Sequence, residues 1–233
     1  MNIIAMIPTY NEAGNIKGMI EDILSLPLDI EVLVVDDNSP DGTARIVGDM
    51  AKIDHRVHLL LRTERRGRGW AGIDGFKKAL ELGASYVVEM DGDRSHDPRY
   101  IPALRAAADT ADAAVGSRYV AGGKDEERSF VRRMISGFAR RYLAAVLGVR
   151  LADPTSGFRI FSRKALECIL PFLSARDPFI VSEVIFYLKR QGLTIKEVPI
   201  EFMSRGSGES KLRPATLFKY LLRVWKLRLQ IGL

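Results

Sequence analysis

The first half of the chain alternates short runs of β-branched and other apolar residues with stretches of helical periodicity. This alternation is typical of a mostly parallel sheet with helices on both faces. The expected strands are 3–7, 30–35, 57–61, 86–90 and 113–116, and the expected helices are 15–26, 43–53, 72–82 and 99–108. We therefore predict an α/β fold of the Rossmann type, in which ligands bind beyond the carboxyl ends of the strands.

The second half of the chain is less regular. We expect helices over 130–147, 181–191 and 215–229, and strands over 158–161 and 195–202. The glycine-containing segments 122–128 and 204–210 are interpreted as loops. We find no internal repeat and no clear linker between domains.

Composition restricts the class of protein. With 47% hydrophobic and 27% charged residues, the chain has the balance of an ordinary soluble globular protein. The single cysteine, Cys168, excludes an intramolecular disulfide, and no run approaches the roughly 20 apolar residues that span a bilayer. The formal net charge is +6, and from Ser210 onward there are six Lys and Arg and no acidic residue. Such a basic end suits nucleic acid, anionic lipid or an acidic partner.

The acidic run Asp91-Gly92-Asp93 directly follows an expected strand. Two carboxylates at a strand end point into the same space beyond the sheet, and hard anionic oxygens suit Mg²⁺ or Mn²⁺. Such a cation keeps several waters and shares its other positions with substrate phosphates. The alternative is a solvated turn, because Asp and Gly favour turns for conformational reasons. The triplet thus indicates either a metal–diphosphate site or a turn.

Two further strand ends carry distinctive residues. Asp36 and Asp37 follow the second expected strand, where a carboxylate can accept hydrogen bonds from a nucleobase or ribose. The same residues also fit an Asx-turn before a helix capped by Asp41 or Thr43, and both interpretations can hold together.

Residues 67–72 match the G-x-G-x-x-G pattern, but they follow the third strand rather than the first. We therefore predict a glycine-rich loop near a different nucleotide, not a dinucleotide site.

Basic residues supply the remaining candidates. Arg118 follows the fifth expected strand, where a guanidinium could bind phosphate through two hydrogen bonds; the alternative is a solvated surface charge. Arg205 lies in the loop 204–210, which could close over a diphosphate or could be a plain linker. The last expected helix carries an apolar face with Trp225 and a separate basic face. This pattern fits either an interfacial membrane helix or an ordinary surface helix packed on the core.

Taken together, these segments resemble a known family. The segments IPTYNE (7–12), VDDNSPDGT (35–43) and MDGD (90–93) resemble the family 2 glycosyltransferases, whose fold is called GT-A. The segments 116–119, 153–159 and 205–212 narrow the resemblance to the dolichol-phosphate mannosyltransferases and their polyprenyl-phosphate relatives. The resemblance implies a catalytic domain over residues 1–213, with residues 214–233 forming a basic amphipathic helix.

The resemblance also implies an activity and its residues. The reaction would be transfer of mannose from GDP-mannose to dolichyl or another polyprenyl phosphate, with inversion and with Mg²⁺ or Mn²⁺ as cofactor. The residues that would bind the nucleotide sugar are Pro8, Tyr10, Glu12, Asp37, Asp91, Arg205 and Lys211. Asp91, Asp93 and Ser95 would surround the metal; Arg118, Arg132 and Ser136 would bind the lipid phosphate; Asp93, Arg118 and Arg205 would be the catalytic group. Arg68 and Trp70 depart from the smaller or apolar residues that are usual in the family.

The implied partners are the membrane surface and small membrane-anchoring subunits, at the cytoplasmic face of a membrane. A phosphate acceptor needs no general base, because its second pKa is about 6 and it is largely dianionic at pH 7. The alternatives are transfer of glucose or another hexose, a catalytically silent binding subunit, a nucleotidyltransferase, and a nucleic-acid binder. We expect no nucleic-acid partner, because the sequence contains no recognised module for one.

Overall fold

The computed structural model describes residues 2–125, 130–202 and 214–229 of the 233-residue chain. A seven-stranded sheet lies at its centre, with strand order β3-β2-β1-β4-β7-β5-β8. Its strands are β1 (Ile3–Thr9), β2 (Ile30–Asp36), β3 (Val57–Leu61), β4 (Tyr86–Glu89), β5 (Ala113–Ser117), β7 (Arg159–Ser162) and β8 (Ile195–Pro199). Strand β7 runs antiparallel to β4 and β5, and the other neighbouring pairs are parallel. The predicted α/β class with a mostly parallel sheet is confirmed.

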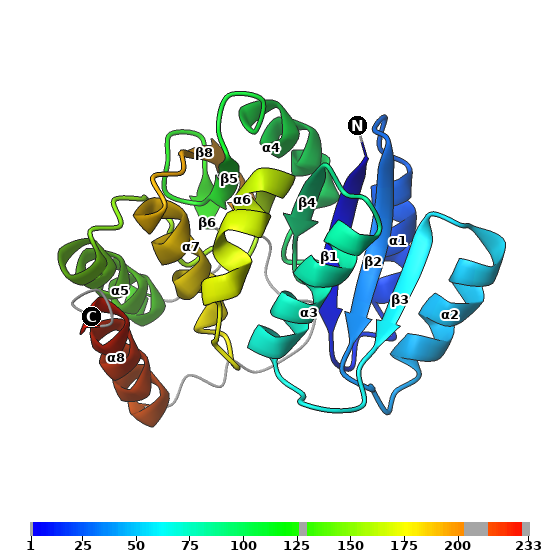
Figure 1. The fold of residues 1–233 in the computed structure, drawn as a ribbon, viewed down its shortest axis with the longest axis horizontal. Coiled ribbons are helices and arrows are strands. Elements are labelled where there is room, and N and C mark those ends of the chain that lie inside the picture. The colour runs from blue at the N-terminus through cyan, green and yellow to red at the C-terminus, as the bar shows by residue number, and fades with distance from the viewer. Residues whose placement is uncertain (1, 126–129, 203–213, 230–233) are drawn as a thin grey trace.

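Helices cover both faces of this sheet (Figure 1). They are α1 (Ile16–Leu24), α2 (Thr43–Ile53), α3 (Arg68–Glu81), α4 (Ile101–Ala107), α5 (Phe130–Leu147), α6 (Arg163–Ile169), α7 (Ile180–Arg190) and α8 (Pro214–Leu229). Short 3₁₀ turns, η1 (Pro98–Tyr100) and η2 (Leu170–Phe172), precede α4 and follow α6. Alternate residues of β1 enter different cores: Ile4 and Met6 pack with α3 and α7, whereas Ile3, Ala5 and Ile7 pack with α1 and α4. This alternation follows from the two-residue period of a strand.

Several elements differ from the sequence-based expectation. Helix α3 begins at Arg68, not at residue 72, so residues 68–71 form its first turn. The expected strand 195–202 divides into β8 and β9 (Glu201–Phe202), and β9 pairs with β6 (Lys124–Asp125) in a small second sheet. Part of the expected loop 122–128 is therefore a strand. Helix α6 was not expected, because its seven residues are too few to show a clear helical period.

The C-terminal helix α8 packs beside α5, at the opposite end of the molecule from α2 and β3 (Figure 1). Val224 and Leu227 are buried in the core that α7 also enters, and the Tyr142 hydroxyl of α5 donates a 3.1 Å hydrogen bond to the Leu221 carbonyl. The surface-helix interpretation is thus confirmed for this face of α8. In the part of the chain that the structure describes, no helix is long and apolar enough to cross a membrane.

Candidate active site

Several of the distinctive segments at the strand ends meet at one cleft. Residues at the ends of β1 and β4, the first turn of α3, the segment before β7 and the start of α7 line it, whereas no described residue of the segment after β2 does. The lining residues are Pro8, Glu12, Arg68, Asp91, Gly92, Asp93, Thr155, Gly157, Pro178 and Val181. The cleft lies beyond the carboxyl ends of the parallel strands, which is where ligands bind in open α/β sheets.

The acidic run forms a tight, hydrogen-bonded turn at the floor of this cleft. The backbone N–H of Asp91 donates to Nδ1 of His96 at 3.0 Å, and Asp93 accepts from both the hydroxyl and the backbone N–H of Ser95, at 2.5 and 3.1 Å. Ser95 is completely buried. The triplet therefore forms a turn, as one interpretation expected, and its two carboxylates line the cleft; the metal–diphosphate site stays a prediction.

His96 fixes the shape of this turn. Burial lowers the pKa of the imidazole, and the nearby carboxylates of Asp91 and Asp93 only partly oppose that effect. The neutral ring accepts the Asp91 N–H through Nδ1 and stacks on Phe158, with the ring centroids 5.1 Å apart.

The donor set of the cleft fits a hard divalent cation. Asp91 and Asp93 offer carboxylate oxygens, and within the described residues no group of three or more His, Cys, Asp or Glu side chains is arranged to hold a metal. Two carboxylates match Mg²⁺ or Mn²⁺, which take their remaining ligands from water and substrate phosphates. A closed site of the structural zinc type would need four protein ligands.

A chain of buried charges adjoins the acidic run. Arg68 Nη2 lies 2.9 Å from the Glu89 carboxylate and 3.4 Å from Oδ1 of Asp91. Glu89 and Arg159 are both fully buried and form an ion pair across β4 and β7. Sequence reasoning missed Glu89 and Arg159. The available signal was a single acidic residue, Glu89, in an otherwise apolar strand, because a buried carboxylate needs a partner.

Asp37 and Asp36 have separate structural tasks. Asp36 accepts from the Thr9 hydroxyl at 2.9 Å and from the backbone N–H of Ser39 at 2.8 Å, which is the expected Asx-type turn. Asp37 forms a buried ion pair with Arg62 and accepts from the backbone N–H of Gly67 at 2.7 Å. Asp37 therefore joins the end of β2 to the glycine-rich segment. Its nucleoside contact stays a prediction.

Helix α2 begins at Thr43, but its N-cap residue is Gly42 (φ +93°), so neither Asp41 nor Thr43 is the expected N-cap. Asp41 accepts from the backbone N–H and hydroxyl of Thr43, at 3.0 and 2.6 Å, and from the N–H of Ala13 at 2.9 Å. Asp41 thus joins the first residue of α2 to the β1–α1 loop, next to Glu12. Tyr10, which the family resemblance places at the nucleoside, has an exposed side chain at the end of β1.

The glycines of residues 67–72 allow a close approach of two backbones. A Cβ atom on Gly69 would lie 2.1 Å from the carbonyl oxygen of Ala175, and Gly67 has a φ of +137° with its Cβ position 2.6 Å from the Arg176 carbonyl. The Gly69 N–H donates to the Arg176 carbonyl at 3.3 Å. These contacts give the glycine pattern a structural cause, and the nucleotide expected near this segment stays a prediction.

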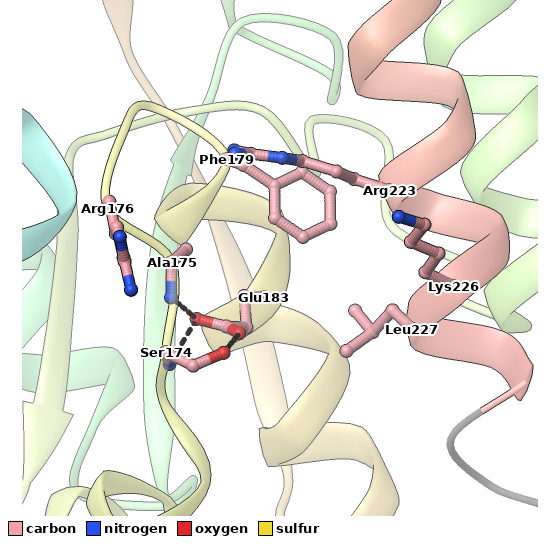
Figure 2. A pocket seen from close by; sticks show the side chains of 8 residues that line it. All are labelled: Ser174, Ala175, Arg176, Phe179, Glu183, Arg223, Lys226 and Leu227. Carbon is pink, nitrogen blue, oxygen red and sulfur yellow. Dashed lines mark hydrogen bonds between the residues drawn. The ribbon is translucent and has the colours of Figure 1, made fainter.

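The loop that meets these glycines is held by Glu183 of α7. Figure 2 shows its carboxylate accepting hydrogen bonds from the Ser174 hydroxyl, at 2.9 Å, and from the backbone N–H groups of Ser174 and Ala175, at 3.0 and 2.9 Å. Across the adjoining pocket, α8 contributes Arg223, Lys226 and Leu227. The loop therefore connects α8 with the glycine-rich segment of the cleft.

Arg118 forms a further buried ion pair near the cleft. Its Nε and Nη2 donate to the two oxygens of Asp153, at 2.6 and 2.8 Å, and Nη2 lies 3.4 Å from the hydroxyl of Thr155, a cleft residue. Burial lowers the pKa of Arg118, but the hydrogen bonds and charge of Asp153 outweigh burial and leave that pKa raised. Arg118 is therefore a permanent cation, placed beside the cleft by the segment that precedes β7.

Four predicted site residues cannot be placed. Arg205 and Lys211 lie outside the described residues. The backbones of Arg132 and Ser136 belong to α5, but their side chains are outside the described part. The roles predicted for these four residues, and the ligand role of Ser95, stay predictions.

Comparison with known families shows which family the chain belongs to. The model of the family described as "Glycosyl transferase family 2" matches residues 4–170, which include every lining residue of the cleft except Pro178 and Val181. The chain belongs to glycosyl transferase family 2. The expected GT-A class and the classification of the chain as a glycosyltransferase are thereby confirmed.

Three curated relatives of this glycosyltransferase are named as mannosyltransferases or a phosphomannose synthase. An undecaprenyl-phosphate mannosyltransferase from Micrococcus luteus is 39% identical over 213 residues, covering 91% of this chain and 88% of the relative. A polyprenol monophosphomannose synthase from Mycolicibacterium smegmatis is 36% identical, covering 97% and 87%. A dolichol-phosphate mannosyltransferase from Pyrococcus furiosus is 36% identical over 97% of this chain, which spans 64% of that relative.

Solved structures share the fold of this glycosyltransferase. The glucosyl-3-phosphoglycerate synthase of Mycobacterium tuberculosis, solved in complex with Mn²⁺, UDP-glucose and phosphoglyceric acid, superposes with a TM-score of 0.68 at 22% identity. The match covers 98% of this chain and 79% of the synthase. At this identity the similarity establishes the shared architecture alone.

Proposed function

We propose that the protein transfers mannose from GDP-mannose to a polyprenyl phosphate, such as dolichyl phosphate, and releases GDP. The observation that carries this proposal is the agreement of the relatives at 36–39% identity, which are named for mannose and a polyprenyl phosphate. The cleft at the strand ends supports it, because it brings Asp91 and Asp93 together with the cationic side chain of Arg68. Carboxylates of this kind hold a cation that binds the diphosphate of a nucleotide sugar.

The donor would bind from the β1 and β2 ends towards the acidic run. Pro8, Tyr10, Glu12 and Asp37 would contact the nucleoside, while Asp91, Arg205 and Lys211 would contact the sugar diphosphate. Asp91, Asp93 and Ser95 would hold Mg²⁺ or Mn²⁺. A divalent cation there supplies positive charge against the negative charge that develops on the departing diphosphate. Asp93 is held for this role by two hydrogen bonds from Ser95.

The acceptor is a phosphate monoester that is already charged, so no residue has to remove a proton from it. Its oxygen attacks the anomeric carbon from the face opposite the leaving diphosphate, which inverts the configuration. Arg118, Arg132 and Ser136 would bind the acceptor phosphate. The Asp153 carboxylate holds the Arg118 guanidinium in one orientation, and such preorganisation reduces the cost of arranging charge during the reaction.

The proposed lipid acceptor and the exposed side of α8 support contact with the membrane surface. Leu222, Trp225 and Leu229 expose 46%, 51% and 66% of their surface, and they recur at a spacing that places them on one side of the helix. Lys226 and Arg228 are exposed nearby. Exposed Trp and Leu combined with basic residues are typical of a helix that lies in the membrane interface. We place the protein peripherally at the cytoplasmic face of a membrane, where small anchoring subunits would be further partners.

Donor-dependent release of free nucleotide tests this function. The protein is mixed with a polyprenyl phosphate in detergent and with GDP-mannose, GDP-glucose or UDP-glucose in turn, and released GDP or UDP is measured. We expect GDP release from GDP-mannose that requires the lipid phosphate. Release from UDP-glucose in its place would assign the glucosyl alternative, and no release from any donor would favour a binding subunit.

A further inference from the structure

We propose that Arg68 is a resident cation of the donor site, which weakens binding of a divalent metal ion at Asp91 and strengthens binding of a nucleoside diphosphate. This inference rests on the proposed donor site. It assigns to Arg68 a positioning and charge-balancing role, which differs from the roles of the residues that would hold the metal or the nucleotide.

The position of Arg68 is fixed by two carboxylates. Its Nη2 lies 2.9 Å from Oε1 of Glu89 and 3.4 Å from Oδ1 of Asp91, and its side chain is 20% exposed while lining the cleft. Gly72, one helical turn further along α3, lies beside the guanidinium, and its Cβ position is 3.4 Å from Arg68 Nη1. The guanidinium therefore has a defined place beside the acidic run.

The charge of Arg68 is not needed to neutralise the protein interior. Glu89 already has a fully buried partner in Arg159, whose Nη1 also donates to the Val181 carbonyl at 2.8 Å. A buried carboxylate needs one compensating cation, and Arg159 supplies it. The second cation beside Glu89 thus acts mainly on what enters the cleft, through the carboxylate of Asp91.

The sign of the effect follows from Coulomb's law. A positive charge beside Asp91 repels a divalent cation bound by that carboxylate and attracts the anionic diphosphate of a nucleotide. The interaction is strong because Arg68 is mostly withdrawn from water. Charges at such a position are screened less than charges on the surface. Removing the charge should therefore tighten the binding of metal and weaken the binding of nucleotide. A loss of local structure would weaken both.

The test measures two separate affinities in wild type and in Arg68→Met. One is the affinity for Mn²⁺ without nucleotide, from the electron paramagnetic resonance signal of free Mn²⁺. The other is the affinity for GDP in EDTA, from calorimetry. We expect roughly tenfold tighter Mn²⁺ binding and roughly tenfold weaker GDP binding, each equivalent to about 1.4 kcal/mol. Arg68→Lys should stay within about threefold of wild type for both ligands, because the charge is retained.

Two further variants complete the design. Arg66→Met removes the same charge from an exposed position in the preceding segment and should change neither affinity. Arg68→Gln can keep a hydrogen bond to Glu89, so it gives the same two shifts if Arg68→Met does not fold. Weaker binding of both ligands, or no change in either, would overturn the proposal. If wild type binds neither Mn²⁺ nor GDP, the proposed donor site itself is wrong, which is a different result.

Discussion

Arg118 and Asp153 form a two-pronged, buried ion pair, with Nε–Oδ2 and Nη2–Oδ1 distances of 2.6 and 2.8 Å. Asp153 is completely inaccessible and Arg118 is 5% exposed. The segment that precedes β7 is also bound to β8, because the backbone N–H groups of Ala152 and Asp153 donate to the carboxylate of Glu197 on β8. One rigid unit thus joins β5, β8 and the segment before β7 beside the cleft.

Asp153→Ala should lower the free energy of unfolding by about 3 kcal/mol or more, because it leaves the buried Arg118 charge without its partner. Urea denaturation followed by circular dichroism measures the change. Asp49→Ala, which removes an exposed ion pair with Lys52, is the matched control and should leave the midpoint unchanged. Equal midpoints for the two variants would contradict the structural role given to Asp153.

Asp93→Ala and Asp93→Asn should each abolish transfer while leaving the fold intact. Alanine removes a proposed metal ligand, and asparagine keeps the shape of the side chain but loses its charge. The far-ultraviolet circular dichroism spectrum checks folding, and initial rates over a range of Mn²⁺ concentrations check the site. Turnover close to wild type in either variant would remove Asp93 from the metal site.

Gly69→Ala should destabilise the protein by about 1–3 kcal/mol, because the new Cβ would overlap the backbone of the loop at Ala175. The displaced loop should also raise the KM for the nucleotide sugar, since Arg68 is the preceding residue. Thermal unfolding and donor titrations measure these effects. Gly14→Ala is the control, because no atom lies within 4 Å of the added Cβ. If both alanine variants behave as wild type, the close approach of the two backbones is not tight in solution.

Trp225→Ser combined with Leu222→Ser should weaken binding to anionic liposomes by tenfold or more, because large apolar side chains no longer enter the interface (about 1.5 kcal/mol or more for each fully buried side chain). Sedimentation with sucrose-loaded vesicles measures the bound fraction. Ile53→Ser removes a residue of α2 that is 89% exposed at the other end of the molecule, and it should have no effect. Unchanged liposome binding in the double variant would argue that α8 serves packing alone.

The Asp41 carboxylate gives a prediction of pH dependence. Burial raises its pKa, but hydrogen bonds from Thr43 and Ala13 outweigh burial, so the folded protein has a pKa below the ordinary value of 3.8. A lowered pKa stabilises the folded state above the unfolded pKa, and this contribution is lost as the pH falls through the folded value. The stability difference between wild type and Asp41→Asn should therefore be constant above about pH 5 and shrink towards pH 3. A difference that grows on acidification would reverse the assigned sign.

Local patterns predicted the sheet and the position of the cleft, whereas pairings between distant residues were not predictable. The strand runs and the acids at their ends lie within a few residues of each other, so their order implied both the fold and the convergence. Arg159 and Glu89 are 70 positions apart, and Arg118 and Asp153 are 35 apart. No periodicity links such residues. The close contact of Gly69 with Ala175 was hidden for the same reason, and the glycines were assigned to a ligand rather than to a neighbouring loop.

The most direct test of the proposed activity follows the sugar itself. Radiolabelled GDP-mannose and dolichyl phosphate are incubated in detergent with wild type or with Asp93→Ala, each with Mn²⁺ and with EDTA, and label in the extracted lipid is counted. We predict label in the lipid for wild type with Mn²⁺, and none in EDTA or in the variant. Equal label in wild type and Asp93→Ala would contradict the account. No label from GDP-mannose with folded wild type, while radiolabelled UDP-glucose labels the lipid, would also contradict it.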